Sequence, residues 1–307
     1  MDRPERSSGV NEVRDWFLRL PLAEDVGRWF LRAYFRLVQS RVRASFGDSV
    51  EVPLGKLRFR LDLTEIHDVR MYWSIQRYFG YEPETSRLLP RLLRSGDVFV
   101  DVGANNGYFA ILASQFVGPS GTVYAIEPNP VAVDRLRRNV VLNQLASVVR
   151  VLSCAVGAKD GHAELSISTF EDGWASLAPF PTPRPRVPVR VFALDHLIDP
   201  APAIVLKVDA EGAEPTILEG LEETLARTPN VAIILEWNHL FGSKAWWDWL
   251  SARFRVYTIV ERPVMGVVTQ EIQSWESLRR VFLKNLLLVS GERWTAASIE
   301  RSVVPGR

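Results

Sequence analysis

The sequence has few of the features that mark secreted, membrane-spanning or nucleic-acid-binding proteins. Its single cysteine, Cys154, cannot form an internal disulfide, so we expect a reducing, cytoplasmic compartment. The polar residues 1–9 are not followed by an apolar segment, which predicts no secretory signal. No apolar run is long enough for a transmembrane helix. A formal net charge of +1 gives no electrostatic indication of a nucleic-acid partner.

The segment that organises the chain is residues 97–107, Asp-Val-Phe-Val-Asp-Val-Gly-Ala-Asn-Asn-Gly. Its apolar run is rich in β-branched and aromatic side chains, which is typical of a strand buried on both faces. Gly103 and Gly107 follow, and residues 108–116 then have the periodicity of a buried helix. A strand, a glycine turn and a helix N-terminus together predict a site where backbone N–H groups approach a nucleotide-like ligand.

The spacing of this turn narrows the type of ligand. A dinucleotide fingerprint requires Gly-x-Gly-x-x-Gly, but position 105 is Asn. Asp101 ends the strand, and a carboxylate there suits a cationic ligand better than a pyrophosphate. S-adenosylmethionine carries an amino group and a sulfonium, so its charge matches this site. Glu127 follows a second apolar strand, at the place where an acid holds ribose hydroxyls in nucleotide-binding βαβ units.

The 307 residues can bury a large core, and the pattern along the chain predicts four parts. They are an N-terminal helical extension (1–50), a hairpin and helices leading into the core (51–95), an S-adenosylmethionine-binding domain (96–292) and a C-terminal tail (293–307). The hairpin is expected over residues 50–63, with its turn at Gly55-Lys56.

The N-terminal extension contains a helical pattern over residues 12–45. Arg28, Arg32 and Arg36 recur every four residues along one edge, and apolar side chains cover most of the remaining surface. We favour packing of this helix on the main domain or on a second subunit, which would allow a homo-oligomer. The alternative is peripheral contact with a membrane surface or a lipid-linked substrate.

Strands and helices alternate after the glycine turn, which predicts an α/β fold with a parallel sheet and helices on both faces. The expected strands are residues 98–102, 122–126, 148–156, 203–208, 231–235, 255–260 and 286–290, with further extended pieces at 164–168 and 189–192. The expected helices are residues 66–79, 83–94, 131–143, 215–227 and 245–254, and residues 170–188 are expected to be a loop. Ligands bind at the carboxyl ends of parallel strands, and Asp101, Glu127, Asp209 and Glu236 all fall at such ends.

Several short motifs occur together along these predicted strands and helices. They are Asp101-Val-Gly-Ala-Asn-Asn-Gly107, Glu127-Pro128, Asn139 with Leu142-Asn143, Ser176-Leu177, Leu194-Asp195-x-Leu197 and Lys207-Val-Asp-Ala-Glu-Gly-Ala-Glu214. This combination resembles the FkbM family of S-adenosylmethionine-dependent methyltransferases, from about residue 57 to about residue 290. The resemblance implies a class I methyltransferase (Rossmann-like) fold, with a seven-stranded, mostly parallel sheet whose last strand is antiparallel. It also implies methyl transfer, usually to a hydroxyl of a sugar or natural product.

The motifs at the strand ends give a set of candidate site residues. The expected cofactor-binding residues are Asp101, Gly103, Ala104, Asn105, Gly107, Glu127, Pro128 and Asp209. Methyl transfer to an alcohol is helped by a base that takes the hydroxyl proton. Asp209 is the first candidate for that base, and Glu211, Glu236 and His239 are the others; of the histidines, only His239 follows a strand end. Lys207 is expected to pair with a carboxylate, and Glu82, Glu84 and Glu214 to be helix-start charges.

Two further features allow a structural and a functional interpretation. Asp209, Glu211 and Glu236 could share a divalent cation, but nothing in their spacing requires one, and we predict no metal site. Trp237, Trp246, Trp247 and Trp249 are expected to pack in the core, with a stacking wall for a sugar as the alternative for two of them. In the long loop, Trp174 and Ser176 could close over the site.

Three functions are compatible with these motifs. The first is O-methylation of a hydroxyl on a sugar, glycolipid or secondary metabolite. The second is a nicotinamide-dependent oxidoreductase, which the Asn at position 105 and the Asp101 carboxylate disfavour. The third is a non-catalytic S-adenosylmethionine-binding scaffold subunit. The intact segment 207–214 argues against the third.

Overall fold

The structure is a computed structural model that describes residues 36–78, 80–167, 175–176, 185–210, 212–237, 242–262, 266–281, 284–295 and 298–299. Most of the predicted N-terminal helix therefore lies outside the described residues. Its described part, residues 36–46, is helical. Val42 on this helix packs against Leu63 and Val69, and Gln39 Nε2 donates to the carbonyl of Thr64 (2.7 Å). For residues 36–46, packing on the main domain is the arrangement observed.

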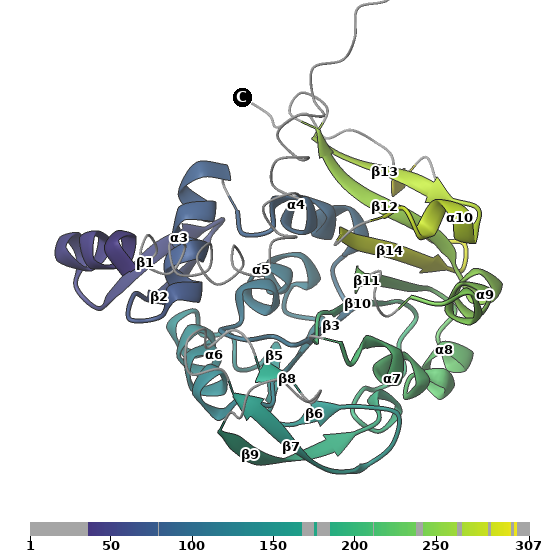
Figure 1. The fold of residues 1–307 in the computed structure, drawn as a ribbon, viewed down its shortest axis with the longest axis horizontal. Helices are drawn as coiled ribbons and strands as arrows, with labels where there is room; N and C mark the ends of the chain where they lie inside the picture. The colour runs from purple at the N-terminus through teal and green to yellow at the C-terminus, as the bar shows by residue number, and fades with distance from the viewer. Residues whose placement is uncertain are drawn as a thin grey trace, which may run out of the picture.

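The main sheet has eight strands in the order β13-β12-β14-β11-β10-β3-β4-β5 (Figure 1). Their bounds are β3 (Val98–Val102), β4 (Thr122–Ile126), β5 (Val149–Leu152), β10 (Ile204–Val208), β11 (Val231–Trp237), β12 (Arg255–Arg262), β13 (Gly266–Ile272) and β14 (Lys284–Ser290). The five strands from β11 to β5 pair in parallel, whereas β14 runs antiparallel between β11 and β12. The α/β fold and its antiparallel last strand are thus confirmed.

The prediction of seven strands was one short, because a further strand, β13, pairs antiparallel with β12 and forms the edge of the sheet. The order of the parallel strands reverses between β3 and β10, which lie side by side at the centre. In open α/β sheets such a switch point leaves a crevice at the carboxyl ends of the two strands.

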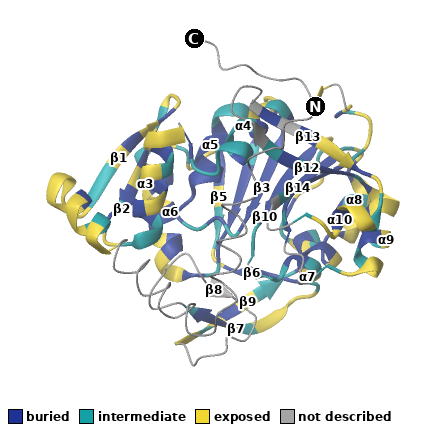
Figure 2. Ribbon diagram, turned by 45° about the horizontal axis from the view of Figure 1, so that its top comes forward, coloured by how far each residue is buried: buried dark blue, intermediate teal, exposed yellow. Residues whose placement is uncertain are grey.

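Helices cover both faces of the sheet and divide the core in two (Figures 1 and 2). On one face lie α3 (Ile66–Tyr78), α4 (Pro83–Leu92), α5 (Tyr108–Val117) and α6 (Pro130–Leu142); on the other lie α7 (Glu214–Glu219), α8 (Glu222–Arg227), α9 (Lys244–Arg253) and α10 (Trp275–Leu278). Every residue of β3 and β10 is buried, and successive residues alternate between the two cores. Burial on both faces explains why these strands read as unbroken apolar runs.

Two smaller units flank the main sheet. The predicted hairpin is confirmed as β1 (Ser49–Leu54) and β2 (Leu57–Asp62), which pair antiparallel around Gly55-Lys56. A second sheet has the order β6-β9-β7-β8, formed by β6 (Ala155–Val156), β7 (Gly161–Ile167), β8 (Ala175–Ser176) and β9 (Arg186–Phe192). A short 3-10 helix, η1 (Leu194–His196), follows β9.

Three predicted segments differ from the structure. The strand expected at 148–156 is divided into β5 and β6, which belong to different sheets. The helix expected at 215–227 is divided into α7 and α8 at Gly220, whose backbone lies against the carbonyl oxygen of Gly157. The loop expected at 170–188 contains β8 and the first residues of β9.

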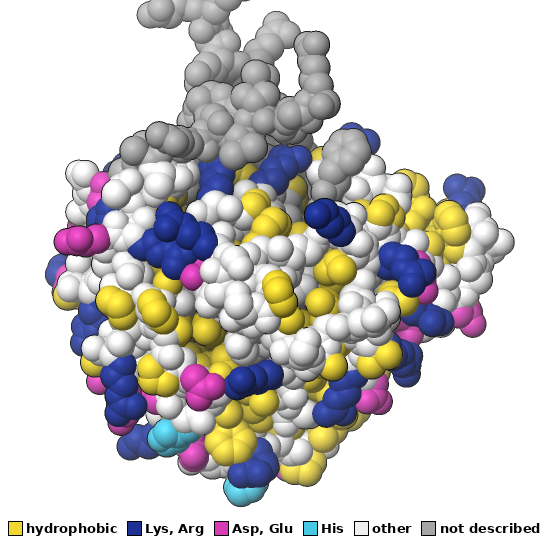
Figure 3. All heavy atoms as spheres, turned by 180° about the vertical axis from the view of Figure 1, so that it is seen from behind, with side chains coloured by type: hydrophobic (Ala, Val, Ile, Leu, Met, Phe, Trp, Pro, Cys, Tyr) yellow, Lys and Arg dark blue, Asp and Glu magenta, His cyan; other side chains and the backbone are white. Residues whose placement is uncertain are grey.

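The surface shows no single dominant charge. On the face in Figure 3, Lys and Arg side chains are spread among acidic, apolar and polar ones, in keeping with the net charge of +1. Among the helices that the structure describes, none is both long enough and apolar enough to cross a bilayer.

Candidate active site

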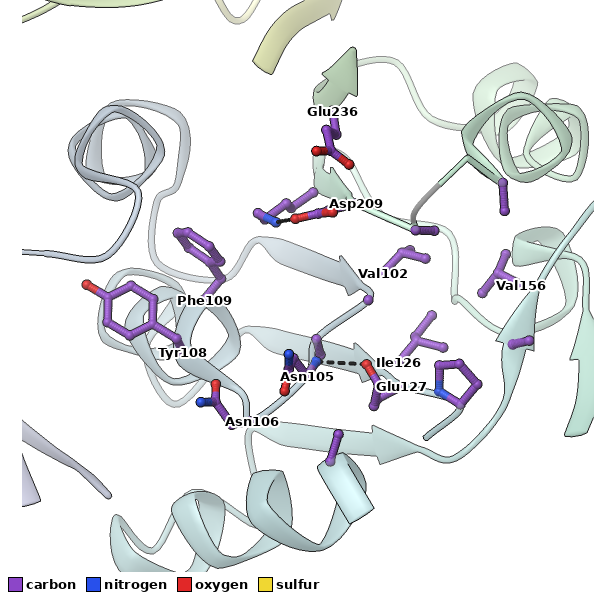
Figure 4. Close-up of a pocket in the computed structure, with 18 of the residues that line it drawn as sticks. Val102, Asn105, Asn106, Tyr108, Phe109, Ile126, Glu127, Val156, Asp209 and Glu236 are labelled. Atoms are coloured by element: carbon purple, nitrogen blue, oxygen red, sulfur yellow. Dashed lines mark hydrogen bonds and ion pairs between the residues drawn. The ribbon is translucent and has the colours of Figure 1, made fainter. Parts of the chain in front are cut away.

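A cavity of about 300 Å³ opens at the carboxyl ends of β3, β4, β10 and β11, at the switch point between β3 and β10 (Figure 4). Its lining combines the glycine turn after β3, the segment after β4, the acidic end of β10 and side chains from α3 and the loop before α4. The predicted site residues Gly103, Ala104, Asn105, Glu127, Pro128, Asp209 and Glu236 all line it.

The glycine turn brings its backbone unusually close to the end of β10. Gly103 has a φ of +80°, and a Cβ placed on it would lie 1.9 Å from the carbonyl oxygen of Asp209. A side chain at this position would therefore force the turn and the β10 end apart. Gly107 has a φ of +90° and precedes α5 as its N-cap residue, which turns the first amides of that helix toward the loop.

Glu127 connects the two loops on the β4 side of the cavity. Its Oε2 accepts a hydrogen bond from Asn105 N (2.9 Å; Figure 4), and its Oε1 accepts one from Asn129 N (2.8 Å). Burial raises the pKa of this carboxyl to about 7, against the two backbone hydrogen bonds that lower it. Each oxygen keeps a second lone pair, so a ligand hydroxyl in the cavity can still donate to Glu127.

Charged side chains gather on the α5 face of the sheet because alternate strand residues point to the same side. Asp101 and Lys207 are paired across β3 and β10, and Asp209 follows two residues after Lys207. The Lys207 ammonium donates to Asp209 Oδ2 (2.7 Å), lies 3.9 Å from Glu82 Oε1 and 4.8 Å from the centre of the Phe109 ring. A cation is thus held between two carboxylates and an aromatic face.

This arrangement shifts the pKa values of Asp209 and Lys207 in opposite directions. Burial by itself would raise the pKa of Asp209, but the ion pair and hydrogen bond with Lys207 lower it, helped by a hydrogen bond with Glu236. Burial would lower the pKa of Lys207, but Asp209, Glu82 and Asp101 outweigh it and raise that pKa. Asp209 is therefore ionised at neutral pH, and among the residues that the structure describes Lys207 is the cation that pairs with it.

The segment before the glycine turn supplies a wall of the cavity that the sequence did not reveal. His67 on α3 lines the cavity with its ring edge-on to Tyr81 (5.7 Å), and burial lowers the pKa of His67 to about 4. Arg70, Tyr81 and Glu82 line it as well. No local pattern marks these residues, because their position depends on how α3 and α4 pack on the sheet.

Comparison with known proteins supplies the family. Residues 101–259 match the model described as the methyltransferase FkbM domain. The chain belongs to the FkbM methyltransferase family. This range contains the glycine turn, Glu127 and the acidic end of β10, so it covers most of the cavity of this FkbM-family protein.

Three curated relatives are similar over part of their length. A 31-O-demethyl-FK506 methyltransferase FkbM from Streptomyces tacrolimicus is 31% identical over 43% of this chain and 62% of its own. The methyltransferase sdnD from Sordaria araneosa is 28% identical over 43% of this chain and 62% of its own. A hexuronic acid methyltransferase AglP from Haloferax volcanii is 28% identical over 52% of this chain and 64% of its own. The FkbM-family chain thus spans less than two thirds of each relative.

Solved structures give weaker similarities. An O-methyltransferase from Bacillus cereus in complex with SAH aligns with a TM-score of 0.39 and 15% identity, over 69% of this chain and 80% of its own. A SAM-dependent O-methyltransferase from Thermotoga maritima aligns with a TM-score of 0.40 and 12% identity, over 80% of this chain and 86% of its own. Similarities of this size support no conclusion about activity.

Several other residues that the sequence predicted for the site of this FkbM-family chain do not line the cavity or lie outside the described residues. Asp101 and Gly107 shape the site but do not line the cavity: Asp101 is buried beside Lys207, and Gly107 packs against Leu136. Glu214 accepts hydrogen bonds from Ala210 N (2.9 Å) and Gly212 N (3.2 Å), as a helix-start acid should. The base candidates Glu211 and His239 lie outside the described residues, as does Trp174.

The tryptophans after β11 do not form a wall of the cavity. Trp237 and Trp247 are buried in the core, and Trp246 and Trp249 pack against it with their rings 5.8 Å apart. None of the four lines the cavity, so the core interpretation is the one that the structure supports. Within the described part of the chain, no cluster of three or more His, Cys, Asp or Glu side chains is arranged to hold a metal ion.

Proposed function

We propose that this chain is an S-adenosyl-L-methionine-dependent O-methyltransferase that acts on a hydroxyl of a sugar, glycolipid or secondary metabolite. The observation that carries the proposal is that the glycine turn, Glu127 and the acidic end of β10 line one and the same cavity. Family membership supports methyl transfer. The names of the relatives, which include a hexuronic acid methyltransferase, support a small oxygen-containing acceptor.

The residues present fit S-adenosylmethionine. Glu127 can accept hydrogen bonds from ribose hydroxyls, and Gly103 leaves backbone rather than a side chain against the cavity. Four acidic side chains, Glu82, Glu127, Asp209 and Glu236, outnumber the two basic ones, Lys207 and Arg70, in the lining of the cavity. When bound there, S-adenosylmethionine would supply the methyl group on a sulfonium, whose positive charge these acids favour.

The protein contributes binding, orientation and a place for a proton. Asp209 is held ionised by Lys207, so it can accept a hydrogen bond from the acceptor hydroxyl and orient its oxygen. The hydroxyl proton must leave as the oxygen gains a methyl group. The carboxylates around Lys207 can receive it, and Glu211 and His239 remain sequence-based candidates for the same role. The reaction that we propose uses no metal ion.

Calorimetric titration with S-adenosylmethionine, S-adenosylhomocysteine and NAD tests the cofactor. We expect the first two to bind and NAD not to bind; binding of NAD alone would overturn the proposal. Transfer of label from methyl-tritiated S-adenosylmethionine to the methyl glycosides of glucose, galactose, mannose and glucuronic acid then tests the acceptor class. Binding of S-adenosylmethionine without transfer to any hydroxyl compound would favour the scaffold function instead.

A further inference from the structure

The backbone of Glu82 adopts a conformation that is unusual for its residue type. Its φ is +40° and its ψ is +71°, in the left-handed region that non-glycine residues seldom occupy. It is the N-cap residue of α4, yet its side chain makes no capping hydrogen bond. A capping hydrogen bond therefore does not explain the glutamate at this position.

The surrounding hydrogen bonds hold the loop in this conformation. Ser74 Oγ donates to Gly80 O (2.9 Å), Tyr81 N donates to Tyr108 Oη (3.0 Å), and Ser86 N donates to Glu82 O (2.9 Å). These contacts come from three helices, α3, α5 and α4. A strained residue that is held from several sides and directed into a cavity is typical of a functional site.

The two oxygens of the Glu82 carboxyl have different surroundings. Oε2 accepts a hydrogen bond from Asn285 Nδ2 on β14 (3.3 Å), and the same Asn285 amide donates to Thr85 Oγ1 (2.9 Å). Oε1 faces Lys207 Nζ at 3.9 Å, which is longer than a hydrogen bond. Because Glu82 lines the cavity, Oε1 is the oxygen that remains available to a ligand hydroxyl.

Glu82 and Asp209 share the same cation but differ in their affinity for a proton. Burial raises the pKa of Glu82 and Lys207 acts against it, whereas Lys207 dominates at Asp209 and lowers its pKa. The other groups that face Glu82 are Asp101 on β3, Tyr108 on α5, Tyr81 next to it in the loop, and Glu84 and Thr85 on its own helix. Neighbouring acids whose environments separate their pKa values commonly divide the roles in a proton transfer.

We propose that Glu82 is the catalytic residue that receives the proton of the acceptor hydroxyl, with Asp209 and Lys207 positioning that hydroxyl beside it. The inference rests on the proposed methyl transfer. As the acceptor oxygen bonds to the methyl carbon, the sulfur–methyl bond breaks and its electron pair stays on sulfur. The O–H bond breaks, and the proton passes to Glu82 Oε1. The positive charge of the donor and the negative charge of Glu82 are both neutralised, so charge balances.

The test compares three variants of the full-length chain. Glu82→Gln keeps the shape and removes the base, Asp209→Asn alters the positioning residue, and Glu84→Gln is the matched control at the same helix start. With the best methyl glycoside of the panel above, Glu82→Gln should lower kcat by roughly 10²–10⁴-fold. It should also abolish the fall of kcat toward acid pH. Asp209→Asn should lower kcat but keep this acid limb, and Glu84→Gln should behave as the wild type.

A second measurement needs no acceptor. In protein labelled with ¹³C at the glutamate side-chain carboxyl, the resonance that disappears in Glu82→Gln should titrate at higher pH than the exposed glutamates of the same spectrum. S-adenosylhomocysteine should bind Glu82→Gln and Glu84→Gln with affinities within about threefold of the wild type, because Glu82→Gln impairs proton transfer rather than cofactor binding.

The outcomes separate this inference from the proposed function. If Glu82→Gln keeps its kcat and its acid limb, or if the Glu82 resonance titrates with the exposed glutamates, Glu82 is not the proton acceptor. If no glycoside is methylated although S-adenosylhomocysteine binds, the sugar acceptor is wrong, and a Glu82 resonance that titrates with the exposed glutamates then still overturns the assignment of Glu82.

Discussion

Both ends of the Asn139 amide hold the backbone of Arg60: Arg60 N donates to Asn139 Oδ1 (2.8 Å), and Asn139 Nδ2 donates to Arg60 O (3.2 Å). Asn143, one turn further along α6, makes the same pair of bonds with Arg58 (2.9 and 2.7 Å). Two asparagines on one helix face thus bind the free edge of β2 as a neighbouring strand would. Asn139 Nδ2 also donates to Asn106 O (3.0 Å), which ties the hairpin to the glycine turn.

The Asn139 amide should be the stronger of these two connections. Asn139 is 1% exposed, so Asn139→Ala removes the partner of the buried Asn106 carbonyl and of the partly buried Arg60 backbone groups. We expect a loss of roughly 1–3 kcal/mol in the free energy of unfolding, measured by urea denaturation. Asn143→Ala is the matched control and should cost less, because water can replace its more exposed bonds. Equal losses would contradict this account.

The close approach of Gly103 to Asp209 should make any side chain at position 103 costly. Gly103→Ala combines a left-handed backbone, which costs a non-glycine residue about 1–3 kcal/mol, with a direct clash against the Asp209 carbonyl. Lower thermal stability and weaker S-adenosylhomocysteine binding should appear together. Gly161→Ala, where a Cβ would meet no atom within 4 Å, should change neither. Normal binding by Gly103→Ala would place the cofactor elsewhere.

The ion pair between Lys207 and Asp209 should be more important to stability than a surface pair, because the Lys207 side chain is 4% exposed. Lys207→Met or Asp209→Asn alone should lower the free energy of unfolding by roughly 3–5 kcal/mol, since each removes one partner of an ion pair whose cation is buried. The double variant should lose clearly less than the sum of the two. Additive losses in a double-mutant cycle would show that the two charges are not coupled.

Cofactor affinity should increase with pH through the Glu127 carboxyl. Burial raises its pKa to about 7, above the unfolded value of about 4.3, so its stabilising contribution is present at acid pH and is lost as the pH rises through 7. A ligand that donates hydroxyl hydrogens to Glu127 favours the ionised form. S-adenosylhomocysteine should therefore bind more tightly at pH 8 than at pH 6 and release protons on binding.

Calorimetry in buffers of different ionisation enthalpy measures this proton release, and Glu127→Gln should reduce it. Burial also raises the pKa of Asp101 to about 7, so a remaining release in that variant is expected from Asp101. Unchanged proton release in Glu127→Gln would show that Glu127 is not the titrating group.

Local sequence pattern was sufficient to predict strands that are covered on both faces and a hairpin with a short glycine turn. The apolar runs of β3 and β10 predicted central strands because both faces are covered by helices. Gly55-Lys56 between alternating residues predicted the hairpin. The edge strand β13 was missed, since only one neighbour, β12, stabilises it and its sequence shows no strong alternation. The break at Gly220 was also missed, because it depends on contact with Gly157.

The sequence by itself determined that acids end the central strands beside a glycine turn, because strand periodicity and φ preferences are local properties of the chain. Only the tertiary structure decided which residues complete the site. His67 and Glu82 reach the cavity because α3 and α4 pack on the same face of the sheet from which Lys207 and Asp209 project. Contacts between residues so far apart in sequence are set by packing of the whole core, and no local pattern encodes them.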